Sequence, residues 1–183
     1  MISNGGPIRI YSLVTLLFGG MVMTAVGQVG RGGFCNKIKP CQLLTQSDAE
    51  KILGQPARLT QDVSLLKGDV RQCMCAYSGA STDQSTGQGS VLFFALEERE
   101  ANASAEQAKQ VLVSTKEANE HDTEIMDLKG IGDEAFLLSN DSSSHLIMAR
   151  RGAIIMRLQV KRAAGPKSLE NTKAFAEKVF KHL

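Results

Sequence analysis

Tryptophan is absent from this 183-residue chain, and seven Phe and two Tyr are its only aromatic residues. These aromatics do not alternate with Lys and Arg, whereas a nucleic-acid surface combines basic clusters with aromatic platforms. The formal net charge of +2 at pH 7 also provides no general attraction to a polyanion. We therefore expect no nucleic-acid partner.

Histidine is scarce, and the common catalytic motifs are missing. The three histidines, His121, His145 and His182, are scattered, without the i, i+4 spacing of a helical metal site. The chain lacks a Gly-x-Ser-x-Gly elbow, a phosphate-binding loop and a His-Glu-x-x-His helix. Asp133 and Glu134 form an acidic pair after a glycine, but such pairs are more often solvated turns than cation sites. The sequence predicts no enzyme, no cofactor and no metal site.

Charge is nearly absent from the first thirty residues, where Arg9 is the only charged residue before Arg31. After Arg9 comes an uncharged run rich in Leu, Val, Ile, Met and Gly, which ends in the small residues Ala25 and Gly27. One cation, an apolar run and small residues at its end are typical of a secretory signal peptide. We expect residues 1–27 to be a signal peptide and the protein to be exported, either to the periplasm or into the medium.

Two alternatives remain for this segment. The uncharged run approaches the roughly 20 residues of a membrane-spanning helix, so residues 10–30 could instead be kept as an anchor. Only then would we expect association with the membrane. Cys35 could carry a lipid, but lipid attachment requires a small residue before the cysteine, and Phe34 stands there. The small residues at the end of the run favour cleavage.

Four cysteines, Cys35, Cys41, Cys73 and Cys75, are the first candidates for chemistry in the rest of the chain. An even number of cysteines in an exported protein indicates disulfide bonds, here two. If Cys73 and Cys75 lie in one strand, they share a face with their Cα atoms about 6.6 Å apart. Each can then reach a separate N-terminal cysteine, in either pairing. A four-thiolate metal site is the alternative, although structural zinc usually takes closer pairs such as Cys-x-x-Cys.

Capping and turn residues mark where the fold begins. Residues 28–40 are expected to form a Gly-rich N-terminal arm, with the fold starting near Cys41. The capping-box spacing of Ser47 and Glu50 predicts a short helix that ends at Gly54.

Hydrophobic periodicity predicts the remaining elements. A second capping box at Ser104 and Gln107 opens a helix that runs to about residue 119, and Ser168 caps a last helix. The predicted strands are residues 57–66, 70–78, 91–96, 124–128, 134–139, 145–149 and 153–160. Residues 79–89 are expected to form a long loop. Since hairpins dominate, residues 41–183 are predicted to be one α+β domain, an antiparallel sheet of about six to seven strands with three helices packed on it.

Basic residues are concentrated near the C-terminus, with nine bases and two acids over residues 150–181. In the last predicted strand Arg157, Gln159 and Lys161 should point to solvent, since alternate residues of a strand face opposite sides. The residues expected in the core are Met156, Leu158 and Val160. Arg157 and Lys161 form a candidate anion-binding face. Acidic and basic regions that face each other, or are separately solvated, would explain the same charge pattern.

Several short motifs resemble those of a protein family. They are Cys41-Gln-Leu-Leu-Thr45, Ile52-Leu53-Gly54, Cys75-Ala-Tyr77-Ser78 and Gly130-Ile131-Gly132-Asp133-Glu134-Ala135. In these motifs the chain resembles small exported proteins and lipoproteins, of actinobacterial type, whose function is unknown. It is also similar to extracellular sensor domains of bacterial Ser/Thr kinases. The resemblance implies a disulfide between Cys41 and Cys75, which would leave Cys35 and Cys73 for a second bridge. It also implies an antiparallel α+β sandwich and a role in binding or interaction.

Taken together, the sequence predicts an exported, non-enzymatic domain that binds a small molecule, a lipid or a protein of the cell envelope. The alternatives are a structural or protein-interaction module of the envelope and an uncharacterised hydrolase. A deep apolar pocket would favour ligand binding, and a flat apolar patch would favour an interface. A Ser or Cys within hydrogen-bond reach of a His would favour a hydrolase.

Overall fold

A computed structural model describes residues 34–67, 70–82, 89–99, 105–121, 123–141 and 143–183. The signal peptide expected over residues 1–27 and the alternative anchor over residues 10–30 lie outside the described residues.

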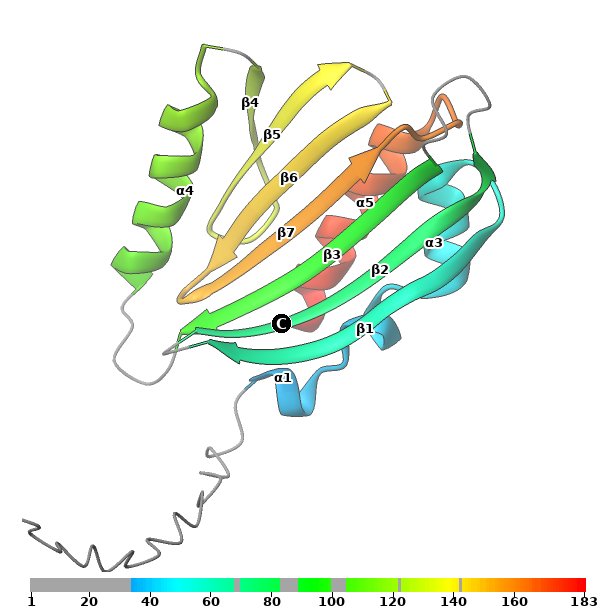
Figure 1. The fold of residues 1–183 in the computed structure, drawn as a ribbon. Helices are drawn as coiled ribbons and strands as arrows, with labels where there is room; N and C mark the ends of the chain where they lie inside the picture. The colour runs from blue at the N-terminus through cyan, green and yellow to red at the C-terminus, as the bar shows by residue number, and fades with distance from the viewer. Residues whose placement is uncertain (1–33, 68–69, 83–88, 100–104, 122, 142) are drawn as a thin grey trace, which may run out of the picture. The chain divides into compact units, whose positions relative to one another are not determined.

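Seven strands form a single antiparallel sheet in the order β1-β2-β3-β7-β6-β5-β4 (Figure 1). They are β1 (Ala57–Lys67), β2 (Val70–Thr82), β3 (Gly89–Arg99), β4 (Glu124–Leu128), β5 (Glu134–Asp141), β6 (Ser144–Arg151) and β7 (Ile154–Lys161). Consecutive strands are neighbours except at the centre, where β3 pairs with β7. The chain thus builds one half of the sheet, crosses to the far edge and returns strand by strand. The predicted antiparallel α+β class is confirmed.

Three helices of two turns or more accompany the sheet, α3 (Gln46–Leu53), α4 (Ala105–Asn119) and α5 (Ser168–His182). Two single turns, α1 (Phe34–Lys37) and α2 (Pro40–Leu43), precede them. The predicted start near Cys41 is therefore too late. Cys35 is only 5% exposed and Pro40 is buried, so the second part of the expected arm belongs to the fold.

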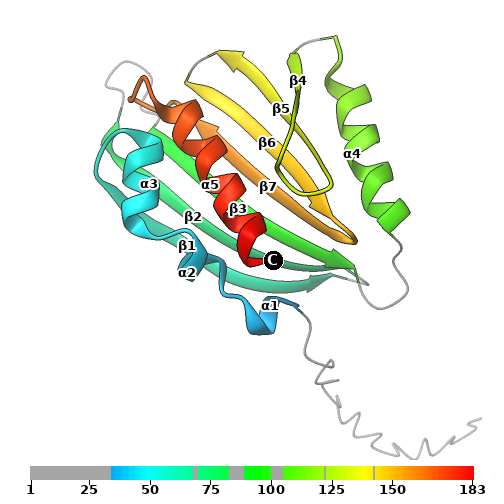
Figure 2. The same cartoon turned by 180° about the vertical axis from the view of Figure 1, so that it is seen from behind.

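Helices pack on both faces of the sheet (Figure 2). On one face α3 and α5 enclose the larger core, where the rings of Phe94 and Phe175 meet edge to face with centroids 5.3 Å apart. On the opposite face, which we call the α4 face, Ala108 and Leu112 of α4 pack against Phe136 and other side chains of β5 to β7. Among the described helices, none packs on the β1 to β3 part of the α4 face.

Strand β7 follows the predicted alternation. Met156, Leu158 and Val160 are buried against α5 and its neighbours in the larger core. Arg157 and Gln159 are half-buried and Lys161 is exposed. The register of β7 was therefore predicted correctly, and its polar residues lie on the α4 face.

The structure corrects two predicted helix starts. Helix α3 is capped by Thr45, whose side chain accepts from the Asp48 N–H at 3.2 Å while the Asp48 carboxylate accepts from the Thr45 N–H at 3.2 Å. The expected box at Ser47 and Glu50 is not used, because the helix begins at Gln46 and Ser47 already lies inside its first turn. Ser168 does not cap α5; it is the first helical residue and is buried.

A third correction concerns the loop predicted over residues 79–89. Strand β2 continues to Thr82 and β3 begins at Gly89, so only the six residues between them lie outside the two strands. Those six are outside the described residues.

Candidate functional site

Two disulfide bonds fasten the N-terminal turns to β2. Cys35 of α1 is bonded to Cys73, with Cα atoms 5.7 Å apart, and Cys41 of α2 to Cys75, with Cα atoms 5.2 Å apart. This is the pairing that the resemblance implied. Because all four sulfurs are bonded, they form no thiolate metal site, and Cys35 has no free sulfur for a lipid. Such bonds persist in an oxidising compartment outside the cytosol.

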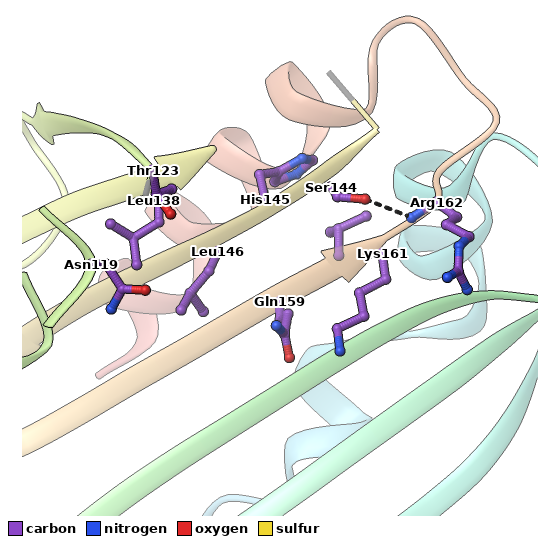
Figure 3. Close-up of a pocket in the computed structure, with 10 residues that line it drawn as sticks. Asn119, Thr123, Leu138, Ser144, His145, Leu146, Gln159, Lys161 and Arg162 are labelled. Carbon is purple, nitrogen blue, oxygen red and sulfur yellow. Dashed lines mark hydrogen bonds between the residues drawn. The ribbon is translucent and has the colours of Figure 1, made fainter. Parts of the chain in front are cut away.

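A pocket of about 320 Å³ opens where β6 begins and β7 ends, beside the last turn of α4 (Figure 3). Its lining residues are Asn119, Thr123, Leu138, Ser144, His145, Leu146, Gln159, Val160, Lys161 and Arg162. Leu138 and Leu146 contribute an apolar floor from β5 and β6. Asn119 and Thr123 add polar groups from the end of α4 and the segment after it.

Cationic side chains stand on the β7 side of this pocket. Figure 3 shows Gln159, Lys161 and Arg162 extending in the same direction from β7 and the residue after it. Gln159 and Lys161 are two residues apart in the strand, so their side chains point to the same face of the sheet. Arg162 should alternate to the other side, and its backbone conformation explains why it does not.

Arg162 has a φ of +54°, in the left-handed region that residues other than glycine rarely adopt. Three hydrogen bonds hold the chain in this turn. The Arg162 N–H donates to Ser144 Oγ at 3.2 Å, and the Arg162 carbonyl accepts from Ser90 Oγ. The Ala163 N–H donates to the Ser143 carbonyl at 2.9 Å. Side chains from β3 and β6 therefore fix the place of Arg162 at the pocket.

His145 lies on the wall of the pocket and is only 4% exposed. Its Nε2 is 2.9 Å from Thr172 Oγ1, and that hydroxyl donates to the Ser168 carbonyl at 2.7 Å. Since the hydroxyl has one hydrogen, Thr172 accepts from His145, which assigns the proton to Nε2. His145 Nδ1 is then a buried acceptor without a partner among the described residues.

Burial lowers the pKa of His145 from 6.5 to about 4. Desolvation is the main cause, the positive charge of Lys173 acts in the same direction, and the negative charge of Asp141 opposes it. The ring is therefore neutral at pH 7, and it links the start of β6 to the first turn of α5.

The two residues of the predicted anion-binding face, Arg157 and Lys161, have different surroundings. Arg157 Nε lies 3.1 Å from Glu97 Oε1, although the N–H does not point at that oxygen. Glu97 also accepts from Gln72 Nε2 at 2.9 Å. The charge of Arg157 is thus compensated on the sheet, while Lys161 lies at the pocket with Arg162 as its neighbour.

The acidic pair that suggested a cation site is used in another way. Arg150 contacts Glu134 at 3.0 Å and Asp133 at 3.4 Å, and Asp133 also accepts from the Gly152 N–H at 2.7 Å. These carboxylates fasten the β4–β5 turn to the β6–β7 turn. Within the described residues, no group of three or more His, Cys, Asp or Glu is arranged to hold a metal ion. Of the other histidines, His121 and His182 are both exposed.

Sequence reasoning missed Arg162, Ser144 and Asn119. The neighbouring cations Lys161 and Arg162 were visible in the sequence, but strand alternation put them on opposite sides. Ser144 and Asn119 carry no motif, and only the pairing of β6 with β7 and the placement of α4 bring them together.

Comparison with family models, with curated proteins and with solved structures finds no match for this chain. In the part of the chain that the structure describes, no helix is long and apolar enough to cross a membrane.

Proposed function

We propose that this protein is an exported, non-enzymatic domain that binds a small ligand in the pocket between α4 and the end of the β6–β7 hairpin. The pocket itself is the observation that supports this proposal. Its volume of about 320 Å³ is at the lower end of the usual range for small-molecule sites. Seven of its ten lining residues are polar or charged, which favours a polar ligand with a small apolar part.

Export is part of the proposal and is supported by the two disulfide bonds together with the signal-like N-terminus. Cleavage after residue 27 would leave the whole described domain free of the apolar run. A retained run over residues 10–30 would instead anchor the same domain to a membrane.

The geometry around His145 favours binding over hydrolysis. A nucleophilic hydroxyl needs a base whose lone pair faces its proton. His145 presents its N–H to Thr172, and the Thr172 proton is directed to the Ser168 carbonyl. This arrangement gives Thr172 no base and serves to hold two elements together.

Native mass spectrometry of the protein purified from its own envelope, with disulfides intact, tests the proposal. We expect a polypeptide that begins near residue 28, contains two disulfides and carries a small bound molecule that is lost on unfolding. A mass that includes residues 1–27 would show a retained anchor. A ligand-free protein that also fails to bind any member of a small-molecule panel would contradict ligand binding.

Because the chain has no tryptophan, one introduced indole can report on the pocket. Glu120→Trp places this fluorophore at an exposed position directly after pocket-lining Asn119, and Lys109→Trp places it on an exposed part of α4 as a matched control. Ligand added to the first variant should shift its emission, and the second should not respond.

A second candidate function is supported by the α4 face over β1 to β3. Val91 is 38% exposed and Leu65 is 48% exposed there, so the surface is partly apolar. Under this candidate the domain is an interaction module of the envelope. A photoreactive side chain at Val91 should then give one discrete crosslinked product in intact cells, whereas the same group at exposed Glu106 should not.

A further inference from the structure

We propose that the pocket selects an anion, and that Lys161 and Arg162 together hold its charged group. This inference rests on the ligand-binding function proposed above and names the chemical class of the ligand. The class is a small amphipathic anion, with a carboxylate or a phosphate at one end and a short apolar body at the other.

The backbone of Arg162 is the first argument. Left-handed conformations in residues other than glycine are unfavourable, and they persist where the surrounding structure imposes them, often at ligand clamps. Here Ser144 and Ser90 impose the conformation through the Arg162 N–H and carbonyl. Ser90 is itself held by Gln55 Nε2 at 2.6 Å. The consequence of this φ is specific: it brings the guanidinium to the same side as the Lys161 ammonium.

The charges around the pocket are the second argument. Arg150 and Arg157 have carboxylates beside them. Among the contacts of the described residues, the side chains of Lys161 and Arg162 meet no carboxylate. Asp141 is a nearby acid, and its Oδ1 already accepts from the Ser143 N–H, the Ser143 hydroxyl and the Ser144 N–H, each at 2.7 Å. Two neighbouring cations with no carboxylate partner among the described residues favour an anion in the space beside them.

The floor of the pocket is the third argument, because it limits the kind of anion. Leu138 and Leu146 offer apolar surface, while Gln159 and Asn119 offer amide donors at the edge. Leu138 is only 6% exposed, so an inorganic ion would leave mainly the half-buried Leu146 uncovered. An anion with a short alkyl or aryl part would cover Leu146 and place its charge against Lys161 and Arg162.

Calorimetric titration of the unchanged protein with five probes tests this inference. The soluble probes are octanoate, octyl phosphate and uncharged octanol. The lipid probes are vesicles of phosphatidylglycerol and, as their control, vesicles of phosphatidylcholine. We expect octanoate and octyl phosphate to bind at least tenfold more tightly than octanol. Their affinity should fall as salt rises from about 0.05 M to 0.5 M, because exposed charges are screened over these concentrations. A response to the phosphatidylglycerol vesicles in addition would identify the anion as a lipid headgroup, and its absence would identify a free amphipathic anion.

Charge-removing variants then test the two named residues. Lys161→Gln and Arg162→Gln should each weaken octanoate binding about fivefold to tenfold and leave octanol binding unchanged. Lys129→Gln is the matched control, since Lys129 is an exposed lysine in the β4–β5 turn, and it should bind octanoate as the unchanged protein does.

Arg162→Gly separates the binding role from a structural one. Glycine accepts a positive φ without strain, so this variant should melt a few degrees higher than the unchanged protein and still lose octanoate affinity. A lower melting temperature with unchanged octanoate affinity would show that Arg162 is structural and would overturn the inference. Equal affinity for octanol and octanoate would also overturn it but leave the proposed ligand-binding function intact. If no probe binds the pocket, both proposals fail for this class of ligand.

Discussion

His145 Nε2 donates to Thr172 Oγ1 across 2.9 Å, and this hydrogen bond joins the first residues of β6 to the first turn of α5. The two residues are 27 positions apart in the chain. The neutral ring makes this bond. Among the described residues no acceptor faces Nδ1, so a proton added there would have no hydrogen-bond partner. Stability should therefore depend on the protonation of His145.

The first prediction is a loss of stability as the pH falls from about 6.5 to about 4. His145 has a pKa of about 4 in the folded protein and 6.5 as the reference value for an unfolded chain. Over that interval the unfolded chain binds a proton that the folded protein does not, so the free energy of unfolding decreases as the pH falls. The decrease should be on the order of 2 to 3 kcal/mol and should stop below the folded pKa.

Urea unfolding at a series of pH values checks this prediction. His145→Asn should be less stable at pH 7 and should lose the part of the pH dependence between 6.5 and 4. His182→Asn, at an exposed histidine, should keep the profile of the unchanged protein. Identical pH profiles for the unchanged protein and His145→Asn would contradict the assignment.

The second prediction concerns the two disulfides. Replacing both partners of either bridge by alanine should cost about 2 to 5 kcal/mol, because each bridge closes a long loop. The sequence separations of 38 and 34 residues are similar, so loop length alone predicts nearly equal effects. We expect removal of the Cys41–Cys75 bridge to cost more, since Cys41 lies directly before α3 whereas Cys35 anchors a single turn. Melting temperatures of the two double variants under non-reducing conditions decide this.

The third prediction distinguishes the two candidate caps of α3. Thr45→Ala should lower the free energy of unfolding by about 1 kcal/mol, because the Asp48 N–H loses its acceptor. Ser47→Ala, which leaves the observed cap in place, should change stability by less than about 0.5 kcal/mol. Chemical denaturation of both variants measures the difference. Equal decreases in the free energy of unfolding would show that Ser47 contributes to the cap as much as Thr45 does.

The fourth prediction compares two glycines of one turn. Gly130 and Gly132 have φ values of +81° and +62°, so alanine is strained at either position. A Cβ at Gly130 would meet nothing within 4 Å, whereas a Cβ at Gly132 would overlap the Arg150 carbonyl. Gly130→Ala should cost about 1 kcal/mol, and Gly132→Ala should cost clearly more, since β6 must also move. Thermal unfolding of the pair gives the comparison, and equal costs would show that only the backbone conformation matters.

The sequence by itself determined the elements and their class. Period-two alternation located β7 and its buried residues Met156, Leu158 and Val160, because a strand with one face in the core has to alternate. Turn residues marked the hairpins, and the two-residue spacing of Cys73 and Cys75 put both on one face of a strand. Helix starts were less well determined, since Thr45 and Ser47 have equivalent capping chemistry and each has an acidic residue three positions later, Asp48 and Glu50.

Only the tertiary structure decided the site. Its residues come from α4, β5, β6 and β7. The hairpins that join β5, β6 and β7 are local, but no local pattern places the last turn of α4 beside them. The alternation that located β7 also misplaced Arg162, because its left-handed φ changes the side on which its own side chain emerges from the strand. Ser144 and Ser90 impose that conformation from β6 and β3, and the contact of Ser90 with Arg162 exists only after β3 has paired with β7, far from it in the chain.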